Sequence, residues 1–276
     1  MKRIVSIQDI SCLGKCSLTV ALPIISAMGV ECSIVPTAVL STHTMFQNFT
    51  CKDLTDQIGP IAAHWKAEKI GFDAIYTGYL ASKEQIGDVC AFFDQFKTEK
   101  NLIVVDPVMA DNGKLYPAFD ADFPAEMAKV CAKADLIVPN LTEASLLTGL
   151  PYKTEYDEAY IRQMLQALAK LGPRYVALTG VSFEKDRVGI MYYDSHTGDF
   201  GSYYTEYLPA SFHGTGDVFA STCVGALMQG KTLGQALALA ADYTVECIRA
   251  TLNDPEAVSY GVEFEKAIPY LVDRMK

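Results

Sequence analysis

The residues with the clearest chemical potential are His213-Gly214-Thr215-Gly216-Asp217, which follow a strand pattern and open an apolar helix. Glycines let the backbone approach a ligand closely. Free amides at a helix start, backed by the positive end of the helix dipole, favour a phosphate or the charge that develops during phosphoryl transfer. We therefore predict an anion hole at Gly214, Thr215 and Gly216, with Asp217 as the base that accepts the proton of an attacking alcohol. Taken alone, the motif could equally be a glycine turn with an acidic first turn.

A second polar site follows another apolar strand pattern, where Val104-Val105 leads into Asp106-Pro107. The proline fixes the exit of the chain, so Asp106 is well placed for Mg²⁺ held through water by one or two carboxylates and substrate phosphates. Asn140 and Glu143 open the next strand-to-helix junction and match a capping pair. We also predict that Glu143 orders a water bound to the ion beside Asp106, and both roles can hold at once.

A further polar cluster, Ser41-Thr42-His43-Thr44, comes after the second predicted strand, whereas Asp9 and Tyr79 come after the first and third. In open α/β sheets the ligand crevice lies beyond the carboxyl ends of the strands. Each of these side chains, taken singly, is more often a packing residue. Their shared position predicts an acceptor pocket lined by Asp9, His43, Thr44 and Tyr79.

Two better-known phosphate motifs are excluded. Gly14-Lys15-Cys16-Ser17 has Cys where a P-loop needs Ser or Thr after Lys, and Asp9 stands where its first glycine belongs. The segment from Gly214 to Phe219 lacks the third glycine of a dinucleotide-binding fingerprint. The sequence supports neither a P-loop enzyme nor a Rossmann dehydrogenase.

The elements that must position these residues alternate along the chain. Strand patterns at 3–8, 32–38, 74–78, 102–106 and 136–139 alternate with helical patterns at 18–28, 54–68, 83–97 and 123–133. This order predicts right-handed βαβ crossovers and a mostly parallel sheet with helices on both faces. After a helix at 155–170, strands at 175–179, 188–194 and 203–208 predict an antiparallel hairpin at one sheet edge. The remaining helices are predicted at 217–229, 233–250 and 262–275.

Composition limits the partners of the chain. Its 276 residues, 50% of them hydrophobic, can bury a large core, and no linker or repeat divides them, so we predict one domain over 1–276. A net charge of -10, without a basic run, disfavours nucleic acid and membrane partners. A nucleoside triphosphate would need backbone amides, a divalent metal ion, or both. No apolar run suggests a signal peptide or membrane span, so we expect a cytoplasmic protein.

Four segments resemble the pyridoxal kinase family in order and spacing: Asp106-Pro107-Val108-Met109, Asn140-Leu141-Thr142-Glu143, Leu178-Thr179-Gly180 and Gly214-Thr215-Gly216-Asp217. The resemblance covers essentially the whole chain and is greatest to the bacterial branch called pyridoxamine kinase. It implies a ribokinase-like three-layer α/β fold and ATP-dependent phosphorylation of the 5′-hydroxymethyl group of pyridoxamine, pyridoxal or pyridoxine in vitamin B6 salvage. It also implies a cytosolic homodimer that uses ATP and Mg²⁺ and is often aided by K⁺.

The resemblance also implies residue roles. Asp217 would deprotonate the hydroxymethyl group, and the amides of Gly214, Thr215 and Gly216 would stabilise the transferring phosphoryl group. Mg-ATP would be bound by Asp106, Asn140, Glu143 and Thr179. The positions matching those around the pyridine ring are His43, Thr44 and Tyr79.

Asp9 departs from the better-studied pyridoxal kinases, which carry Ser at this position near the pyridine ring. A buried carboxylate needs a charged or hydrogen-bonding partner. We therefore expect Asp9 to pair with a protonated ring nitrogen or with the amine of pyridoxamine.

Three alternatives stay open. A hydroxymethylpyrimidine kinase of thiamine synthesis shares this machinery, but its glycine-rich N-terminal substrate loop is absent, and the segment from Asp9 to Gly14 looks like the B6 branch. A sugar or nucleoside kinase would usually carry a Gly-Gly-Asn signature near the N-terminus, which is not found. A non-catalytic B6-binding protein is the alternative from a different class, and the intact Asp217 argues against it.

Overall fold

The computed structural model describes residues 1–275. The strands of the main sheet are β1 (Arg3–Leu13), β2 (Glu31–Thr42), β3 (Cys51–Asp53), β4 (Ala74–Thr77), β5 (Leu102–Val105), β8 (Leu136–Ile137), β9 (Tyr175–Glu184), β10 (Arg187–Asp194) and β11 (Asp199–Glu206). The short strands β6 (Ala110–Asp111) and β7 (Lys114–Leu115) form a separate hairpin. The helices are α1 (Leu18–Ala27), α2 (Thr55–Ala67), α3 (Lys83–Phe96), α4 (Phe123–Cys131), α5 (Leu141–Thr148), α6 (Glu158–Ala169), α7 (Thr215–Met228), α8 (Leu233–Leu252) and α9 (Phe264–Met275).

The sheet has the strand order β11-β10-β9-β8-β5-β4-β1-β2-β3. Strands β2, β1, β4, β5, β8 and β9 are parallel to their neighbours in that series, which confirms the predicted crossovers. At one edge β9, β10 and β11 form an antiparallel meander, so the predicted edge hairpin is confirmed and the three strands predicted there pair in series. Strand β3 adds an unpredicted antiparallel pair with β2 at the other edge.

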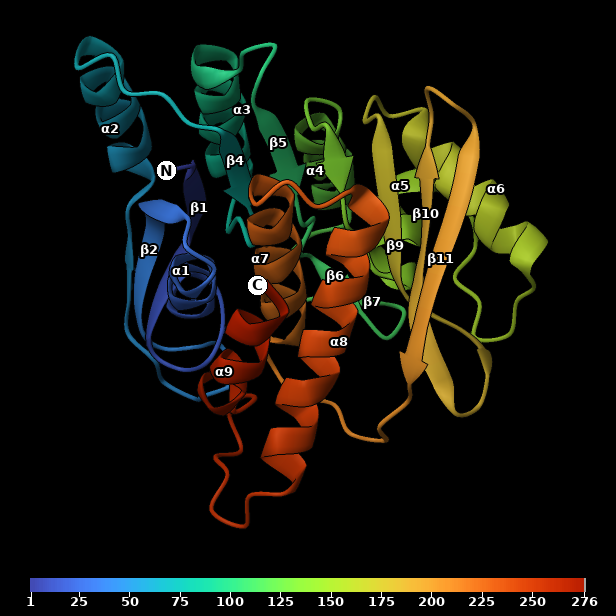
Figure 1. Cartoon of the computed structure of the whole chain (residues 1–276). Coiled ribbons are helices and arrows are strands. Elements are labelled where there is room, and N and C mark those ends of the chain that lie inside the picture. Colours follow the sequence, from blue (N-terminus) through green and yellow to red (C-terminus); the bar gives the residue numbers. More distant parts are fainter. Residues whose placement is uncertain (276) are drawn as a thin grey trace.

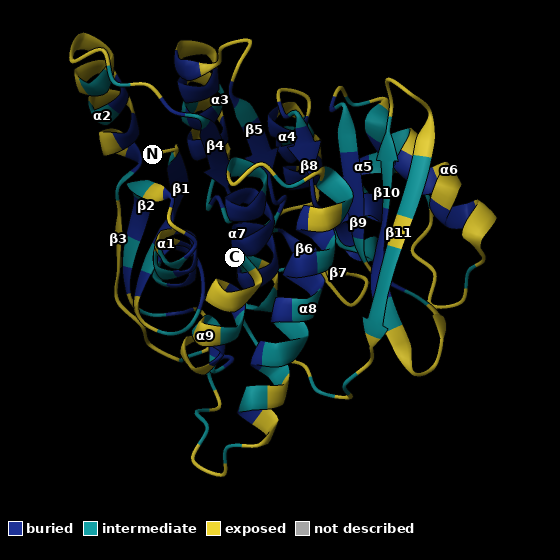
Figure 2. Cartoon of the chain, in the orientation of Figure 1, coloured by how far each residue is buried: buried dark blue, intermediate teal, exposed yellow. Residues whose placement is uncertain are grey.

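The core lies on both faces of the sheet because its strands alternate. In β4, Ala74 and Tyr76 pack into one apolar cluster and Ile75 packs into the other. Helices α1, α7, α8 and α9 supply the first cluster, whereas α2 to α6 supply the second. Figure 1 shows α7, α8 and α9 in front of the sheet, and Figure 2 shows the central strands and α7 as buried. The fold is therefore the three-layer α/β arrangement that the sequence predicts.

The predicted ends of the first two strands are wrong. Strand β1 continues past Gln8 to Leu13, and β2 continues past Ala38 to Thr42, because the two strands stay paired up to Leu13 and Thr42. Their pairing shifts register between Gln8 and Ile10. Asp9 thus sits inside β1 at an irregularity, where a bulge can redirect a side chain, and does not follow the strand as predicted.

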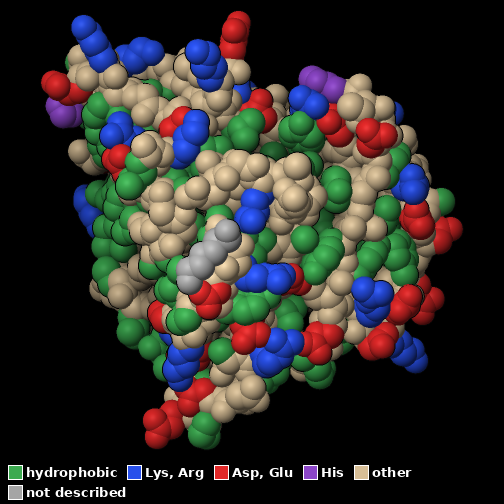
Figure 3. All heavy atoms as spheres, in the orientation of Figure 1, with side chains coloured by type: hydrophobic (Ala, Val, Ile, Leu, Met, Phe, Trp, Pro, Cys, Tyr) green, Lys and Arg blue, Asp and Glu red, His purple; other side chains and the backbone are tan. Residues whose placement is uncertain are grey.

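The surface carries mixed charge. On the face drawn in Figure 3, Lys and Arg side chains lie among Asp and Glu side chains. Within residues 1–275, no helix has the length and apolar character needed to cross a membrane.

Candidate active site

The N-terminus of α7 is the centre of the site. Gly214 is the N-cap residue, and the first bond of the helix runs from the Val218 amide to the Gly214 carbonyl at 3.0 Å. The amides of Thr215, Gly216 and Asp217 therefore have no partner within the helix, and no side chain caps them. The geometry thus adds the amide of Asp217 to the predicted anion hole. These amides and the helix dipole make this end suitable for a phosphate.

Gly214 is required here for two reasons. Its φ of +83° lies in the left-handed region, and a Cβ atom would lie 1.8 Å from the carbonyl oxygen of Lys15. Gly216 is less constrained, since a Cβ atom there would meet only Asp106 Oδ2, at 3.8 Å. The short approach between Gly214 and Lys15 shows that the loop before α1 packs directly on the predicted anion hole.

A cavity of about 410 Å³ opens in front of this helix end. The predicted residues that line it are Asp106, Asn140, Glu143, Thr179, Gly214, Thr215, Gly216 and Asp217. Its volume is within the range of small-molecule sites. The structure thus brings the predicted nucleotide residues together with the predicted phosphoryl-transfer residues.

Two buried carboxyl groups, those of Asp106 and Glu143, line the cavity. Burial, with the negative charges of Glu143 and Asp217, raises the pKa of Asp106 well above its usual range. Burial also raises the pKa of Glu143 to about 8, although its two oxygens accept the amides of Met109 at 3.1 Å and Asn140 at 2.9 Å. A cation bound beside these two groups would favour their charged forms and offset the cost of burying them.

The donor set fits Mg²⁺. Carboxylate oxygens are the ligands this ion prefers, and none of the described residues lining the cavity is Lys or Arg. Within residues 1–275 no group of three or more His, Cys, Asp or Glu could hold a metal ion by itself, so the predicted site consists of Asp106 and Glu143 with water. A triphosphate in this cavity has only backbone amides and such an ion to balance its charge.

Asn140 is committed to structure. Its Oδ1 accepts the amides of Thr142 at 2.8 Å and Glu143 at 2.9 Å, which completes the predicted capping box. Its Nδ2 donates to the Ala110 carbonyl at 2.9 Å and thereby ties down the β6–β7 hairpin. An isolated bridge pairs Asn140 with Thr179, whose hydroxyl donates to the Pro139 carbonyl at 3.3 Å. Both residues line the cavity with polar groups that are already bonded.

Asp217 and Asp9 form a second pair of interacting carboxylates. Although part of Asp217 is exposed to the cleft, burial of its carboxylate raises the pKa to about 7, a backbone hydrogen bond from Ser17 opposes this, and the charge of Asp9 adds to it. Asp9 is buried and accepts the hydroxyls of Ser17 at 2.6 Å and Ser11 at 3.1 Å. Burial raises its pKa as well.

His43 is held by both ring nitrogens. Its Nδ1 accepts the Met45 amide at 3.2 Å, so the proton lies on Nε2, which donates to the Tyr260 carbonyl at 3.0 Å. Its ring centroid is 4.5 Å from that of His213, the residue before the anion hole. His43 is therefore a buried ring with both nitrogens engaged.

The other predicted acceptor residues are less well gathered. Tyr79 is partly buried and packs on Phe119 at a centroid distance of 5.5 Å, whereas Thr44 is exposed in a turn beyond β2. None of the four predicted acceptor residues lines the 410 Å³ cavity. Asp9 and His43 lie next to the α7 terminus, and the roles of all four remain predictions.

Sequence reasoning missed two features of the site. Ser17 bonds to both Asp9 and Asp217, and nothing in its local sequence indicates this. The β6–β7 hairpin turns at Asn112 and Gly113, both with positive φ, and Asp111 beside it lines the cavity. The Asn-Gly dipeptide is a common hairpin turn and could have indicated these strands.

Replacing Gly214 by Ala should be far more damaging than the same change at the other end of α7. Gly230 has a φ of +84° but no atom within 4 Å of the place that a Cβ atom would take, so Gly230→Ala should cost about 1 kcal/mol of unfolding free energy. Gly214→Ala has the same backbone cost and the contact with Lys15. Urea denaturation should show a loss at least about twofold larger for Gly214→Ala, with loss of phosphoryl transfer. Equal losses for the two variants would contradict this account.

The comparisons with known proteins agree on one family. The family model for phosphomethylpyrimidine kinase matches residues 22–260. A Bacteroides thetaiotaomicron protein assigned to that activity is 40% identical, and its crystal structure covers 98% of this chain and 93% of its own with a TM-score of 0.94. An orthorhombic crystal form of that protein contains pyridoxal; it covers 98% of this chain and 95% of its own with a TM-score of 0.92.

Two further relatives are named for different substrates, one for pyridoxal and one for hydroxymethylpyrimidine. Pyridoxal kinase of Lactobacillus plantarum is 30% identical, and its structure covers 99% of this chain and 97% of its own with a TM-score of 0.91. The hydroxymethylpyrimidine/phosphomethylpyrimidine kinase of Bacillus subtilis is 27% identical over 79% of this chain and 78% of its own. The chain therefore belongs to the phosphomethylpyrimidine kinase family, together with the pyridoxal kinases of the ribokinase-like superfamily.

Proposed function

We propose that this kinase transfers the γ-phosphoryl group of ATP to the 5′-hydroxymethyl group of a vitamin B6 compound. The observation that carries the proposal is the position of Asp217 in the first turn of α7, beside unpaired amides and at the end of the 410 Å³ cavity. A base next to an anion hole is what transfer of a phosphoryl group to an alcohol requires. The membership in a kinase family supports the same reaction.

The proposed mechanism assigns one task to each group. ATP lies in the cavity with its γ-phosphoryl group at the amides of Thr215, Gly216 and Asp217, which stabilise the charge on the transferring oxygens. The acceptor hydroxyl lies against Asp217, which takes its proton as the new P–O bond forms and the bond to ADP breaks. Mg²⁺ held by Asp106 and Glu143 would neutralise phosphate charge at that end of the cavity.

The acceptor is assigned to the side of Asp217 where Asp9 and His43 lie. Asp9 is a buried acceptor of hydrogen bonds, and the His43 ring lies 4.5 Å from His213, which precedes the anion hole. A carboxylate and an aromatic face suit a flat, protonated heteroaromatic ring. The pyridoxal bound by the 40% identical relative supports a B6 compound as acceptor. Homodimer formation, a cytoplasmic location and use of K⁺ remain predictions.

A hydroxymethylpyrimidine kinase is the second candidate function. The matching family model and the Bacillus subtilis relative both carry that substrate in their names. Its acceptor is also a ring-borne hydroxymethyl group, so Asp217 and the α7 amides would act in the same way. The third candidate is a non-catalytic B6-binding protein, in which Asp217 would not act as a base.

A panel of acceptors tests the proposal. Purified protein with Mg-ATP should release ADP and form a phosphorylated product with at least one of pyridoxamine, pyridoxal and pyridoxine, and Asp217→Asn should lower kcat by roughly 10²- to 10⁴-fold. Turnover confined to hydroxymethylpyrimidine would retain the mechanism and replace the substrate. Binding of a B6 compound without any turnover would favour the non-catalytic alternative.

The pH dependence should report Asp217. Its pKa is raised to about 7 and its ionised form is the base, so log kcat/KM should rise with pH up to about 7 and be level above it. Asp9→Asn removes a charge that raises this pKa, so the acidic limb should move to lower pH. Asp242→Asn is the control, because Asp242 pairs with Arg274 and Tyr203 and does not line the cavity, and it should leave the limb in place. An unmoved limb in Asp9→Asn would contradict the assignment.

Asp9 should also set the choice among B6 compounds. If it pairs with the amine of pyridoxamine, Asp9→Ser should reduce kcat/KM for pyridoxamine about tenfold more than for pyridoxine, because one charge-assisted hydrogen bond is lost. The measurement is kcat/KM for the three compounds in both proteins. Unchanged relative efficiencies would show that Asp9 does not select the substrate.

A further inference from the structure

Loop 14–17, defined as residues 14 to 17 between β1 and α1, touches both parts of the phosphoryl-transfer centre. The Lys15 carbonyl packs on Gly214 of the predicted anion hole. If Gly214 carried a Cβ atom, that atom would lie 1.8 Å from the Lys15 carbonyl oxygen. The Ser17 backbone amide bonds to Asp217, and the Ser17 hydroxyl donates to Asp9 at 2.6 Å. A displacement of this loop would therefore move the base and its neighbouring carboxylate together.

The loop needs external restraint because its backbone is strained. Ser17 has φ 51° and ψ -134°, a conformation that residues with a side chain rarely adopt. On its inner side, the Thr19 hydroxyl donates to the carbonyls of Gly14 at 3.1 Å and Cys16 at 2.7 Å. These bonds fix the loop to α1 but do not connect it to the rest of the molecule.

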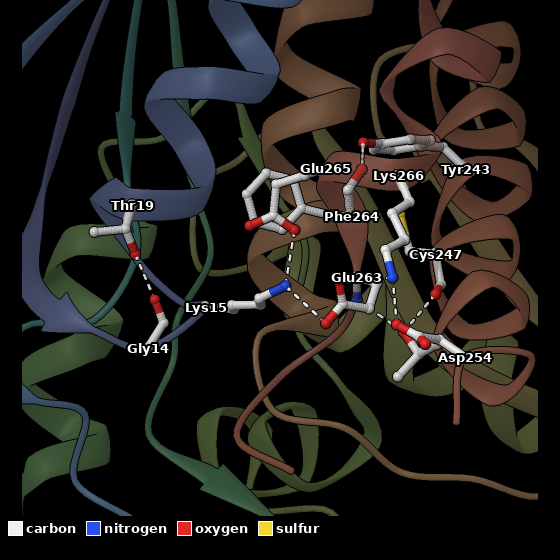
Figure 4. Close-up of polar contacts among 11 residues, drawn as sticks. Gly14, Lys15, Thr19, Tyr243, Cys247, Asp254, Glu263, Phe264, Glu265 and Lys266 are labelled. Carbon is white, nitrogen blue, oxygen red and sulfur yellow. Dashed lines mark hydrogen bonds and ion pairs between the residues drawn. The ribbon is translucent and has the colours of Figure 1, made fainter. Parts of the chain in front are cut away.

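The Lys15 side chain connects the loop to the C-terminal segment of the molecule. Figure 4 shows its ammonium group between two carboxylates from the segment that enters α9, with Glu263 at 3.2 Å and Glu265 at 2.8 Å. The Lys15 and Glu263 side chains are only 13% and 12% exposed, so this pair is less screened than a surface ion pair. Gly261 lets the segment approach, since a Cβ atom there would lie 2.5 Å from that of Lys15.

The segment that holds Lys15 is itself fixed and reaches the acceptor side. The Glu263 amide donates to Thr251 Oγ1 at 2.8 Å, and the Tyr243 hydroxyl donates to the Phe264 carbonyl at 2.9 Å, so α8 anchors it. Three residues earlier, the Tyr260 carbonyl accepts the His43 Nε2 proton at 3.0 Å. One C-terminal segment thus restrains loop 14–17 and His43 from the same side.

We propose that Lys15 is a positioning residue for phosphoryl transfer: its ion pairs with Glu263 and Glu265 hold loop 14–17 so that Ser17 keeps Asp217 oriented. The inference rests on the proposed function of Asp217 as the base. Lys15 touches neither phosphate nor acceptor in this arrangement. Its loss should therefore lower kcat and leave the binding of Mg-ATP unchanged.

The test compares variants of opposite charge. Lys15→Met removes a positive charge, and the double variant Glu263→Gln/Glu265→Gln removes two negative charges. Both nevertheless break the ion pairs that Lys15 makes with Glu263 and Glu265. Both should lower kcat by about tenfold or more, with KM for ATP within about twofold of wild type, because misplaced catalytic groups mainly affect the chemical step. Lys15→Arg should restore most of kcat. Lys266→Met is the matched control, since Lys266 pairs with Glu263 and Asp254 in the same cluster without touching loop 14–17.

A second measurement is independent of turnover. In 15N-labelled protein, the Ser17 amide resonance should shift in Lys15→Met and in the double Gln variant, and stay in place in Lys266→Met. If the wild-type protein phosphorylates no acceptor, the proposed function fails. The Ser17 resonance still decides whether the ion pairs of Lys15 position loop 14–17. Opposite changes of kcat in the two charge variants would identify a general charge effect and overturn the proposal. A lower Tm with unchanged kcat and an unshifted Ser17 resonance would also overturn it.

Discussion

The unpaired amides at the N-terminus of α7 are the feature on which the rest of the site depends. The cavity in front of them is lined by four carboxylate residues, Asp106, Asp111, Glu143 and Asp217, and none of the described lining residues is Lys or Arg. The charge of a phosphate bound there must therefore be balanced by these amides and by added cations. The helix that carries the amides is buried from Val218 to Ala226 between the sheet and its neighbours. A helix buried on all sides cannot shift without disrupting the core, and this fixes the direction of its dipole.

Burial of the carboxylates destabilises their charged forms and raises their pKa values, which suits the tasks proposed for them. The pKa of Asp217 lies near 7, where a base can be ionised yet still take a proton, and the pKa of Glu143 lies near 8. A bound cation would bring Glu143 back to its charged form. A nucleotide bound with a metal ion would therefore relieve the cost of burying these carboxylates at the proposed site.

Much of this site was predictable from the sequence because its residues follow recognisable local patterns. The Gly-x-Gly-Asp helix start, the Asn140–Glu143 capping box and the polar residues at strand ends each depend on a few neighbouring residues. A parallel sheet then brings strand ends together, whatever their separation in sequence. This is why Asp106 and Asn140, which follow β5 and β8, line one cavity together with Thr179 of β9 and Asp217 of α7.

The remaining features depend on contacts that no local pattern encodes. The extension of β1 past Gln8 depends on continued pairing with β2, and it places Asp9 inside a strand. The ion pair of Lys15 with Glu265 joins residues that are 250 positions apart in the sequence, so it exists only once the chain has folded. The three free amides could be assigned only once the helix was seen to begin at Thr215.

A structure of the protein with ADP, Mg²⁺, aluminium fluoride and pyridoxal would show whether the α7 amides and Asp217 act together in phosphoryl transfer. We predict the fluoride group within hydrogen-bond distance of the Thr215, Gly216 and Asp217 amides, with the 5′-hydroxyl of pyridoxal against the Asp217 carboxylate. A fluoride group bound away from the α7 terminus, or a pyridoxal hydroxyl that does not reach Asp217, would contradict it.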